Sequence, residues 1–445
     1  MQERPTERLA EFVLQLRYED IPSDVVEQAR RCILDHLGVV LIGSTLPWTQ
    51  IVYRYIQRWA RAGQSTVVNF GTQYVHMDTA CANAVFAQGC ELDEYGSGHT
   101  GAVVVPTALA LAEETHCSGR EFIASVVAGY DVTGRIHKAT EPSLLRRGFQ
   151  PCGTLGPFGA AAVAGRAFGL NPIEMMHALG IAASHASGLT EYDQTGGEVK
   201  RLHAGLAARS GIESALLARE GLTGPPTAIE GKRGFCHAFS DTVDAGALTR
   251  ELGRQFAIMD VRFKFYPVVG GLQGPLFALQ QLVEAEGIQA ADVREVRFGV
   301  EETTLAHGGS IVEPHDCASA QFSLAFSTAL RLIRRSNDLA LYRDPACWED
   351  ETLLDLARRV HLRANPQTEV EIVMRNGKTH AASLAHPKGS RGNPCTDEDL
   401  EAKFRPLAAS VLPERRIDEL LAAARNIENL DDAANLAALL VAPRG

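Results

Sequence analysis

Residues 22–43 read PSDVVEQARRCILDHLGVVLIG and predict a long helix with one apolar face. Ser23 is suited to cap the first turn, and apolar side chains then recur every three or four residues from Val26 to Val40. Gly43 ends the run, as glycine commonly does at a helix C-terminus. Similar runs follow at about 77–92, 106–116, 119–139, 156–168, 172–186 and 203–219. Many are rich in alanine and glycine, which let helix axes approach closely, so the first half predicts a compact all-helical domain.

The pattern changes after about residue 262. Val293–Val300 alternates with the period of two that is typical of a strand. A second alternating run, Glu369–Met374, leads into RNGK at 375–378, where Asn-Gly predicts a hairpin turn, and Thr379–Leu384 can form the return strand. Helical runs at 272–285 and 318–335 lie between these strands, and the tail at about 397–440 is helical again. We therefore predict a mainly α fold, with a large all-helical domain at 1–262 plus 397–445 and an inserted smaller α+β domain at 263–396.

Composition and charge argue against several classes of protein. The chain has 445 residues, of which 45% are hydrophobic and 22% charged, as in an ordinary globular protein. Its apolar stretches are shorter than the ~20 residues of a membrane span, and the N-terminus lacks the apolar segment of a signal peptide. The formal net charge of −11 argues against a general nucleic-acid binder. No Gly-x-Gly-x-x-Gly follows a predicted strand near the N-terminus, which argues against a nicotinamide enzyme.

The cysteines bear on the compartment and on metals. There are nine, scattered along the chain without a Cys-x-x-Cys pair, which favours reduced thiols and a cytoplasmic location with no membrane partner. The sequence shows no zinc-type spacing and no cysteine cluster of the iron–sulfur kind, so we expect no metal site.

Five motifs follow one another along the chain. They are GCELDEYGSGHTGAVVVP at 89–106, GFQPCGTLG at 148–156, KRLHAGLAA at 200–208, FKFYP at 263–267 and ASAQFSL at 318–324. Each is weak alone, but together and in this order they resemble the MmgE/PrpD family, which includes 2-methylcitrate dehydratase, cis-aconitate decarboxylase and iminodisuccinate epimerase. The resemblance implies a large helical domain with a smaller α+β lid, a homodimer, a small anionic polycarboxylate substrate and no cofactor.

The reactions of such a family share one physical requirement. Dehydration, epimerisation and decarboxylation of these acids all develop charge beside a carboxylate, so the site needs fixed cations, hydrogen-bond donors and proton-transfer groups. His99 is the first candidate for acid or base, because an imidazole changes its protonation near neutral pH. Asp93, a few residues upstream, is suited to orient it or to balance its charge. The alternative is a histidine in a surface loop beside a solvated carboxylate.

Two lysines are candidates for holding substrate carboxylates. Lys200 follows a glycine-containing loop and precedes the helix expected to open near His203, and a lysine there can bind a carboxylate or act as a catalytic base. Lys264 lies at the expected joint with the lid, where a cation can close on an anionic substrate. The alternatives are a plain surface lysine and a charged residue on an amphipathic strand.

Three further residues are candidates for substrate binding. His203 can support the site, or it can pack as a hydrogen-bonded histidine inside a helix. Gln150 can hydrogen-bond a substrate, and Thr154 lies where Gly153–Gly156 opens a small-residue helix whose N-terminal amides can bind an anion. Close helix packing is an equal alternative for this last segment.

The chain departs from the family pattern at four places. Gln150 stands where family dehydratases and decarboxylases usually carry a second histidine, and glutamine cannot transfer a proton near pH 7. Phe326 stands where a tyrosine is expected, and the second aspartate of the family's D-[FY]-D-D element is replaced around Tyr95-Gly96. The segment 268–273 lacks the histidine that usually follows the K-x-[YF]-P element. Fewer acid–base groups therefore remain.

The leading hypothesis is a hydro-lyase of the 2-methylcitrate dehydratase kind, acting on a small hydroxylated di- or tricarboxylate. His99 would be its acid or base, with Asp93 orienting it and Lys200 and Lys264 binding carboxylates. The first alternative is an epimerase (an isomerase) or a decarboxylase of a related polycarboxylate, which the lost acid–base groups favour slightly. The second is a non-catalytic polycarboxylate binder, motivated by Gln150 and Phe326.

Overall fold

The computed structural model describes residues 4–443, and the chain divides into two compact units. The first unit contains the described residues up to Leu189, Arg201–Val261 and those from Thr396 onward. The second contains Thr190–Lys200 and Arg262–Cys395. Most of the described residues are helical, which confirms the predicted mainly α class.

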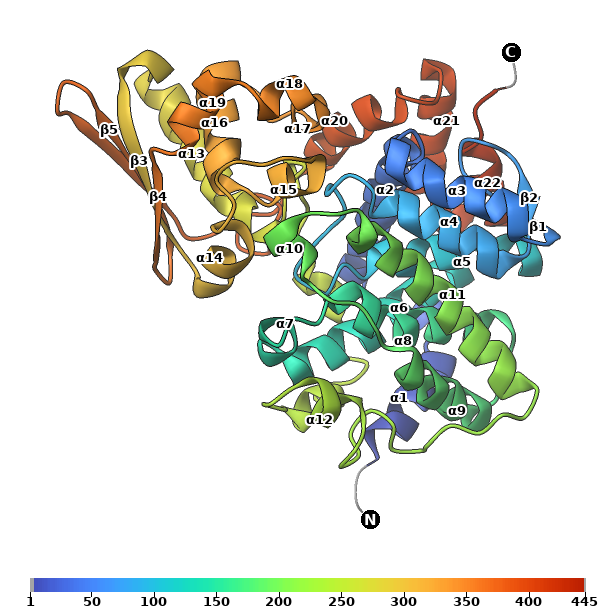
Figure 1. Ribbon diagram of the computed structural model, residues 1–445. Coiled ribbons are helices and arrows are strands. Elements are labelled where there is room, and N and C mark those ends of the chain that lie inside the picture. The colour runs from blue at the N-terminus through green and yellow to red at the C-terminus, as the bar shows by residue number, and fades with distance from the viewer. Residues whose placement is uncertain (1–3, 444–445) are drawn as a thin grey trace. The chain divides into compact units, whose positions relative to one another are not determined.

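The first unit is a bundle of helices with one short antiparallel β-ribbon (Figure 1). Its helices and strands are α1 Pro5–Gln15, α2 Ser23–Ser44, α3 Pro47–Trp59, β1 Ala62–Thr66, β2 Gln73–Tyr74, α4 His76–Ala87, α5 Gly101–Thr115, α6 Gly119–Thr140, α7 Ser143–Arg146, α8 Pro151–Ala167, α9 Pro172–Ala182, α11 Val199–Arg219, α12 Phe235–Phe239, α20 Asp397–Ala408, α21 Glu414–Arg425 and α22 Ala434–Leu439. Of these, α11 begins two residues before the unit boundary at Arg201. The helix predicted from residues 22–43 is confirmed as α2.

Three neighbouring helices, α5, α6 and α8, have nearly all of their residues buried. Their sequences are rich in alanine, glycine and valine, and their backbones come close to one another: a Cβ on Gly159 of α8 would lie 2.3 Å from Oγ1 of Thr133 in α6. A similar approach joins α2 to α4, where a Cβ on Gly43 would lie 1.8 Å from the carbonyl oxygen of Phe86. The small residues of these runs are therefore what allows the helices to pack.

Helix α5 begins earlier than its sequence predicts, and this matters for the loop before it. The helix starts at Gly101, so Pro106 lies inside it and not at its first turn. The Gly101 N–H donates to the side-chain carboxylate of Glu94 at 2.7 Å. A side chain from outside the helix thus satisfies a backbone donor of the first turn, and the proline only removes one hydrogen bond further along.

The second unit contains a four-stranded mixed sheet in the order β4-β3-β5-β6 (Figure 1). The strands are β3 Val293–Val300, β4 Val360–Ala364, β5 Thr368–Met374 and β6 Thr379–Leu384. β3 pairs with β4 in parallel and with β5 antiparallel, and β5 pairs with β6 in the hairpin that Asn-Gly predicts. The three predicted strands are confirmed, whereas the sequence analysis does not predict β4.

Helix α13 packs against β5 and β6, and α14 and α16 pack against β4. The helices are α10 Tyr192–Thr195, the 3₁₀ turn η5 Gly270–Leu272, α13 Gln273–Glu286, α14 Glu302–Gly308, α15 Cys317–Gln321, α16 Leu324–Arg334, α17 Leu339–Arg343, α18 Pro345–Trp348 and α19 Glu351–Ala357. The helical run predicted at 318–335 is two helices, because the side chain of Ser323 accepts from the Phe326 N–H and starts α16 afresh.

Two further features concern the described residues. No single helix among them has the length and apolar character to cross a membrane; α2 and α3 reach that threshold only as a joined pair, bent by 83° at their junction. All nine cysteines lie in this part of the chain, and none forms a disulfide.

The close approach of α2 and α4 gives a test of the packing. Replacing Gly43 with alanine places a methyl group against the backbone of Phe86, which cannot move aside as a flexible side chain can. We expect the free energy of unfolding to fall by about 1–3 kcal/mol, measured by urea denaturation followed by circular dichroism.

The matched control is Gly246→Ala in the same unit. There the nearest atom to a new Cβ is the terminal Nη2 of Arg250 at 3.0 Å, which can rotate away. Equal losses of stability in the two variants would contradict the packing argument.

Candidate functional site

The loop between α4 and α5 carries the predicted His99 and Asp93 and has an unusual backbone. Left-handed conformations occur at Glu91 (φ 58°), Gly96 (95°), Gly98 (80°) and His99 (61°). Glycine adopts this region freely, whereas a residue with a Cβ pays about 1–2 kcal/mol. Other contacts must therefore stabilise the loop around His99.

The structure brings His99 and Asp93 together. Nδ1 of His99 lies 2.7 Å from Oδ2 of Asp93, whose side chain is fully buried, whereas the imidazole is 16% exposed. Because an ionised carboxylate only accepts hydrogen bonds, the imidazole donates from Nδ1, and Nε2 is left to exchange a proton. Asp93 is thus a buried orienting group and not a solvated neighbour.

Glu94, which the sequence analysis misses, fixes the same loop from the inside. Its carboxylate accepts from the Tyr130 hydroxyl (2.6 Å) and the Gly101 N–H (2.7 Å), and Nδ1 of His36 lies 3.5 Å away. Burial raises the pKa of Glu94, while His36 and the two donors oppose the rise. Since Gly101 is two residues from His99, the carboxylate holds the backbone beside the histidine. Tyr130 and His36 lie far away in the sequence, so no local motif marks Glu94.

Two more titratable groups adjoin this loop. Burial lowers the pKa of His137 in α6, and the nearby His99 lowers it further, although Glu141, 3.1 Å from its Nε2, has the opposite effect. Cys152 of α8 directs its thiol towards the carbonyl oxygen of His99 at 3.9 Å. Burial, reinforced by the Asp93 carboxylate, raises the pKa of this thiol, so it stays protonated near pH 7.

Gln150 and Thr154 lie at the start of α8 and bond to its backbone. The side-chain oxygen of Gln150 accepts from the Gly153 N–H (2.6 Å) and caps the helix, which begins earlier than predicted, at Pro151. The Thr154 hydroxyl donates to the carbonyl oxygen of Gln150 at 3.0 Å. One amide expected to bind an anion is therefore occupied by the chain itself. His203 of α11 lies against the same helix end, 3.3 Å from where a Cβ on Gly153 would be.

In the second unit, Lys200 and Lys264 are both buried. Lys200 is 3% exposed, and its Nζ lies 5.7 Å from the centre of the Phe322 ring. It belongs to the first turn of α11, so this helix begins before it and not near His203 as predicted. Lys264 is fully buried. Neither is a plain surface lysine, and burial of an ammonium group is stable only with hydrogen-bonded or charged partners.

A second histidine–aspartate pair, also missed in the sequence, lies in the second unit. Nδ1 of His307 in α14 contacts Oδ2 of Asp193 in α10, and their side chains are 18% and 4% exposed. Nε2 of Gln194 donates to the other oxygen of Asp193 at 2.6 Å. The two partners are 114 residues apart in sequence, so only the folded unit reveals the pair.

Two departures from the family pattern are internal to the second unit. Phe326 is fully buried and packs edge-on against Tyr342, with ring centres 6.4 Å apart. The side chain of Gln273, in the segment expected to carry a histidine, accepts from the N–H groups of Phe265 (3.0 Å) and Tyr266 (3.1 Å). The FKFYP segment is therefore fixed by an internal glutamine.

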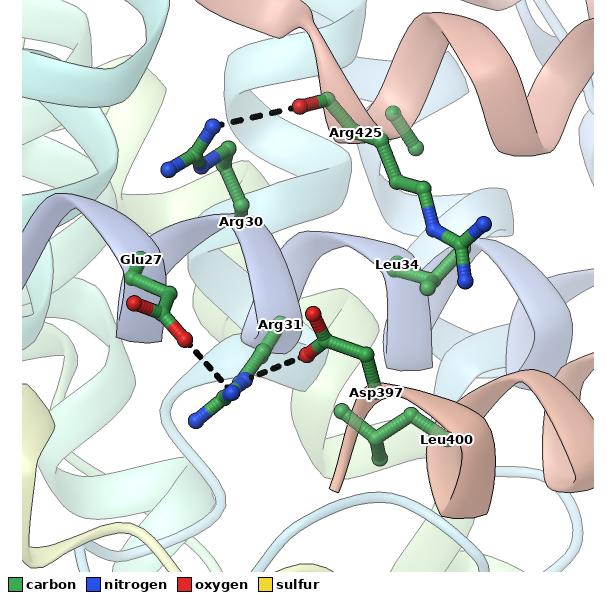
Figure 2. Close-up of a pocket in the computed structure, with 8 residues that line it drawn as sticks. Glu27, Arg30, Arg31, Leu34, Asp397, Leu400 and Arg425 are labelled. Carbon is green, nitrogen blue, oxygen red and sulfur yellow. Dashed lines mark hydrogen bonds and ion pairs between the residues drawn. The ribbon is translucent and has the colours of Figure 1, made fainter. Parts of the chain in front are cut away.

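A surface pocket of the first unit, about 360 Å³ in volume, lies between α2 and the C-terminal helices (Figure 2). Each of its three arginines has a carboxylate partner: Arg31 pairs with Glu27 (2.5 Å) and Asp397 (2.8 Å), Arg30 with Glu428 (2.9 Å), and Arg425 with Glu401 (2.6 Å). The arginine charges are thus neutralised within the protein, which makes this pocket a poor match for a polyanion. Across residues 4–443, no three His, Cys, Asp or Glu side chains gather so as to hold a metal ion.

The raised pKa of Glu94 makes a prediction about stability and pH. The pKa of Glu94 in the folded state lies above the ordinary 4.5. At pH values between the unfolded-state pKa and the folded-state pKa, the folded chain therefore binds more protons than the unfolded chain. Stability then falls as the pH rises through this window, and Glu94→Gln removes the effect. The measurement is the difference in melting temperature, wild type minus Glu94→Gln. We expect this difference to decrease as the pH rises from 4.5.

The control is Glu401→Gln in the same unit. The hydrogen bond from Arg405 lowers the pKa of Glu401, so its contribution to stability is lost as the pH falls. The difference between wild type and this variant should therefore increase with pH. If the Glu94 difference also increased with pH, the assignment of a raised pKa would be wrong.

Comparisons with known proteins agree along most of the chain. It matches the model of the MmgE/PrpD N-terminal domain over residues 7–247 and that of the MmgE/PrpD C-terminal domain over residues 266–429. It is 28% identical to the cis-aconitate decarboxylase-like protein oryM of Aspergillus oryzae, over 98% of this chain and 97% of that protein. It is 29% identical to the cis-aconitate decarboxylase of Aspergillus terreus (98% and 96% covered) and 25% identical to that of Homo sapiens (98% and 95%). With both domain models matched in order, the chain belongs to the MmgE/PrpD family.

Proposed function

We propose that the chain is a lyase that decarboxylates a small unsaturated tricarboxylate of the cis-aconitate type. The support is its family, together with relatives named as cis-aconitate decarboxylases that match 98% of the chain. The sequence alone favours dehydration and keeps decarboxylation as an alternative. The names of the relatives favour decarboxylation. Dehydration of the 2-methylcitrate kind stays a prediction that the product assay below distinguishes.

Decarboxylation of cis-aconitate has a simple electron balance. The departing carboxylate is attached to a CH₂ group beside a carbon–carbon double bond. When the bond to this carboxylate breaks, its electron pair forms a new double bond to the central carbon, and the original double-bond pair moves to the far carbon. That carbon takes up one proton, and carbon dioxide leaves. The reaction needs one proton donor and groups that hold the two retained carboxylates.

The His99–Asp93 pair is the observation that carries the proposal. A buried carboxylate on Nδ1 orients the imidazole and leaves Nε2 as the nitrogen that can deliver a proton. The Glu94 carboxylate adds precision, because its bond to the Gly101 N–H restrains the backbone beside His99. In this proposal Nε2 of His99 protonates the far carbon.

The remaining predicted residues have supporting roles in the proposal. Lys200 and Lys264 bind carboxylates, because buried ammonium groups interact more strongly with an anion than solvated ones do. His203 supports the same end of α8. Gln150 and Thr154 act by fixing the start of that helix, since the contacts described above join them to its backbone.

The first test identifies the product and the proton donor together. Purified protein is incubated with cis-aconitate, and separately with 2-methylcitrate, in D₂O, and the products are followed by NMR and carbon dioxide release. We expect cis-aconitate to lose carbon dioxide and its product to carry one deuterium at the newly formed CH₂ group. His99→Ala should lower turnover by about 10²–10⁴-fold, the usual contribution of general acid–base catalysis.

The control is His237→Ala, which changes an exposed histidine of the same unit and should leave turnover unchanged. Full activity of His99→Ala would remove the proposed donor. Loss of water without carbon dioxide would restore the dehydratase hypothesis, and exchange of a proton without either loss would indicate an epimerase. Tight binding with no product over hours would indicate a non-catalytic binder.

We also propose that the chain forms a homodimer, as the family resemblance implies. Helix α3 exposes Ile51, Tyr55 and Trp59, whose relative exposures are 57%, 54% and 70%. They recur every four residues and therefore lie along one helix face. Contiguous exposed apolar side chains of this kind often mark a protein–protein contact, which makes this face the candidate interface.

Light scattering coupled to size exclusion tests the dimer. We expect the wild type at about twice the chain mass of 48.1 kDa and a shift towards monomer in Trp59→Glu. Ile173→Glu is the matched control, because Ile173 is 66% exposed, close to the 70% of Trp59, but lies on α9. A monomeric wild type would contradict the homodimer, and a dimer that survives Trp59→Glu would exclude α3 as the interface.

A further inference from the structure

Histidine–carboxylate pairs in this chain differ in which partner reaches solvent. In four of them the carboxylate is at least a third exposed: His76–Glu114 (42%), His116–Asp432 (34%), His137–Glu141 (51%) and His380–Glu286 (43%). Two others combine a buried carboxylate with a partly exposed imidazole: His99–Asp93 (16% for the imidazole and 0% for the carboxylate) and His307–Asp193 (18% and 4%). In His36–Glu94 both side chains are buried, and in His361–Glu295 both are partly or well exposed. His307 is therefore held as the proposed proton donor is held, by a buried carboxylate on Nδ1 of a partly exposed imidazole.

The segment that carries Asp193 also carries Lys200. Residues 190–200 form α10 and the first residues of α11, all within the second unit. The ring of Tyr192 packs edge-on against Phe322 (5.6 Å between centres), and Nζ of Lys200 lies 5.7 Å from the centre of the same ring. Between them, Asp316 accepts from the Gly197 N–H at 3.1 Å. The segment is thus fixed at both ends to α15 and to the residue that follows it.

The segment that carries Lys264 reaches the same helix. The Val269 N–H donates to the carbonyl oxygen of Gln321, the last residue of α15, at 3.1 Å. The chain continues directly into η5, and α14, which carries His307, packs against η5. Both lysine-bearing segments and the helix of His307 are therefore tied to one small region of the second unit, around α15 and η5.

The charged groups around His307 are few. Helix α14 packs against α10, η5 and β4. α10 contributes Asp193, and η5 has no titratable residue. β4 carries His361 and Arg363, which are more than half exposed and face Glu295 and Glu369. On its own helix the other titratable residue is Glu302. Asp193 is thus the buried charge in contact with His307.

We propose that His307, oriented by Asp193, binds a retained carboxylate of the substrate by donating from Nε2 as an imidazolium. The proposal rests on the tricarboxylate substrate proposed above and adds a third, pH-dependent cation to Lys200 and Lys264.

Direct binding of tricarballylate tests this role without turnover, because this saturated tricarboxylate has no double bond to receive the electron pair. Calorimetry at pH 6 and pH 8 compares the wild type with His307→Gln. An imidazole normally changes its charge between pH 5 and 8, so the wild type should hold the ligand better at pH 6 than the variant does. We expect roughly 10–100-fold weaker binding by the variant at pH 6, and a much smaller difference at pH 8. The ligand's own ionisation is common to both chains and cancels in the comparison.

His380→Gln is the matched control, since His380 lies in the same unit but pairs with the exposed Glu286, and it should bind as the wild type does. Asp193→Asn is the second variant. It leaves His307 in place but removes the charge that stabilises the imidazolium, so its binding should weaken at pH 6 while its melting curve stays close to that of the wild type. Equal binding by wild type and His307→Gln at both pH values would overturn the role of His307 alone. Absence of binding by the wild type would overturn the tricarboxylate assignment and this proposal with it.

Discussion

The hydrogen bonds accepted by the buried Glu94 carboxylate are the contact on which the candidate site depends. They join the middle of the loop, at Glu94, to the start of α5 through Gly101 and to Tyr130 in α6, and so fix the half of the loop that carries His99. His99 adopts a left-handed backbone, which is unfavourable for any residue with a Cβ. A loop with this conformation persists only where its surroundings determine it, and here a buried polar anchor does so.

The residues assigned in the proposed reaction come from both units. The first holds the His99–Asp93 pair in the loop between α4 and α5, and the close packing of its helices depends on glycine and alanine. The second holds Lys200, Lys264 and the His307–Asp193 pair beside a small mixed sheet. A tightly packed helical unit suits a proton donor whose orientation must stay constant, because the backbone around the donor has little freedom. The two lysines lie at the first turn of α11 and in the FKFYP segment, which an internal glutamine fixes.

Periodicity in the sequence predicts much of the fold, because it records which face of each element is buried. The helix at 22–43, the strand at 293–300 and the hairpin around Asn-Gly are all recovered on this basis. β4 is missed, since its five residues follow a helix directly and are too few to show a pattern. The start of α5 is misplaced because a side chain from outside the helix, and not Pro106, organises its first turn. Pairs such as His307–Asp193 cannot be read from sequence, because the fold alone makes residues so distant into neighbours.

Cys152 lies beside His99, and the environment of its thiol has a chemical consequence. Both the substrate and the product of the proposed reaction contain a double bond conjugated to a carboxylate, which makes them electrophiles towards sulfur. Only a thiolate adds to such a bond at an appreciable rate. Burial and the Asp93 carboxylate suppress the thiolate of Cys152, so this side chain resists covalent addition by the substrate and product of the proposed reaction.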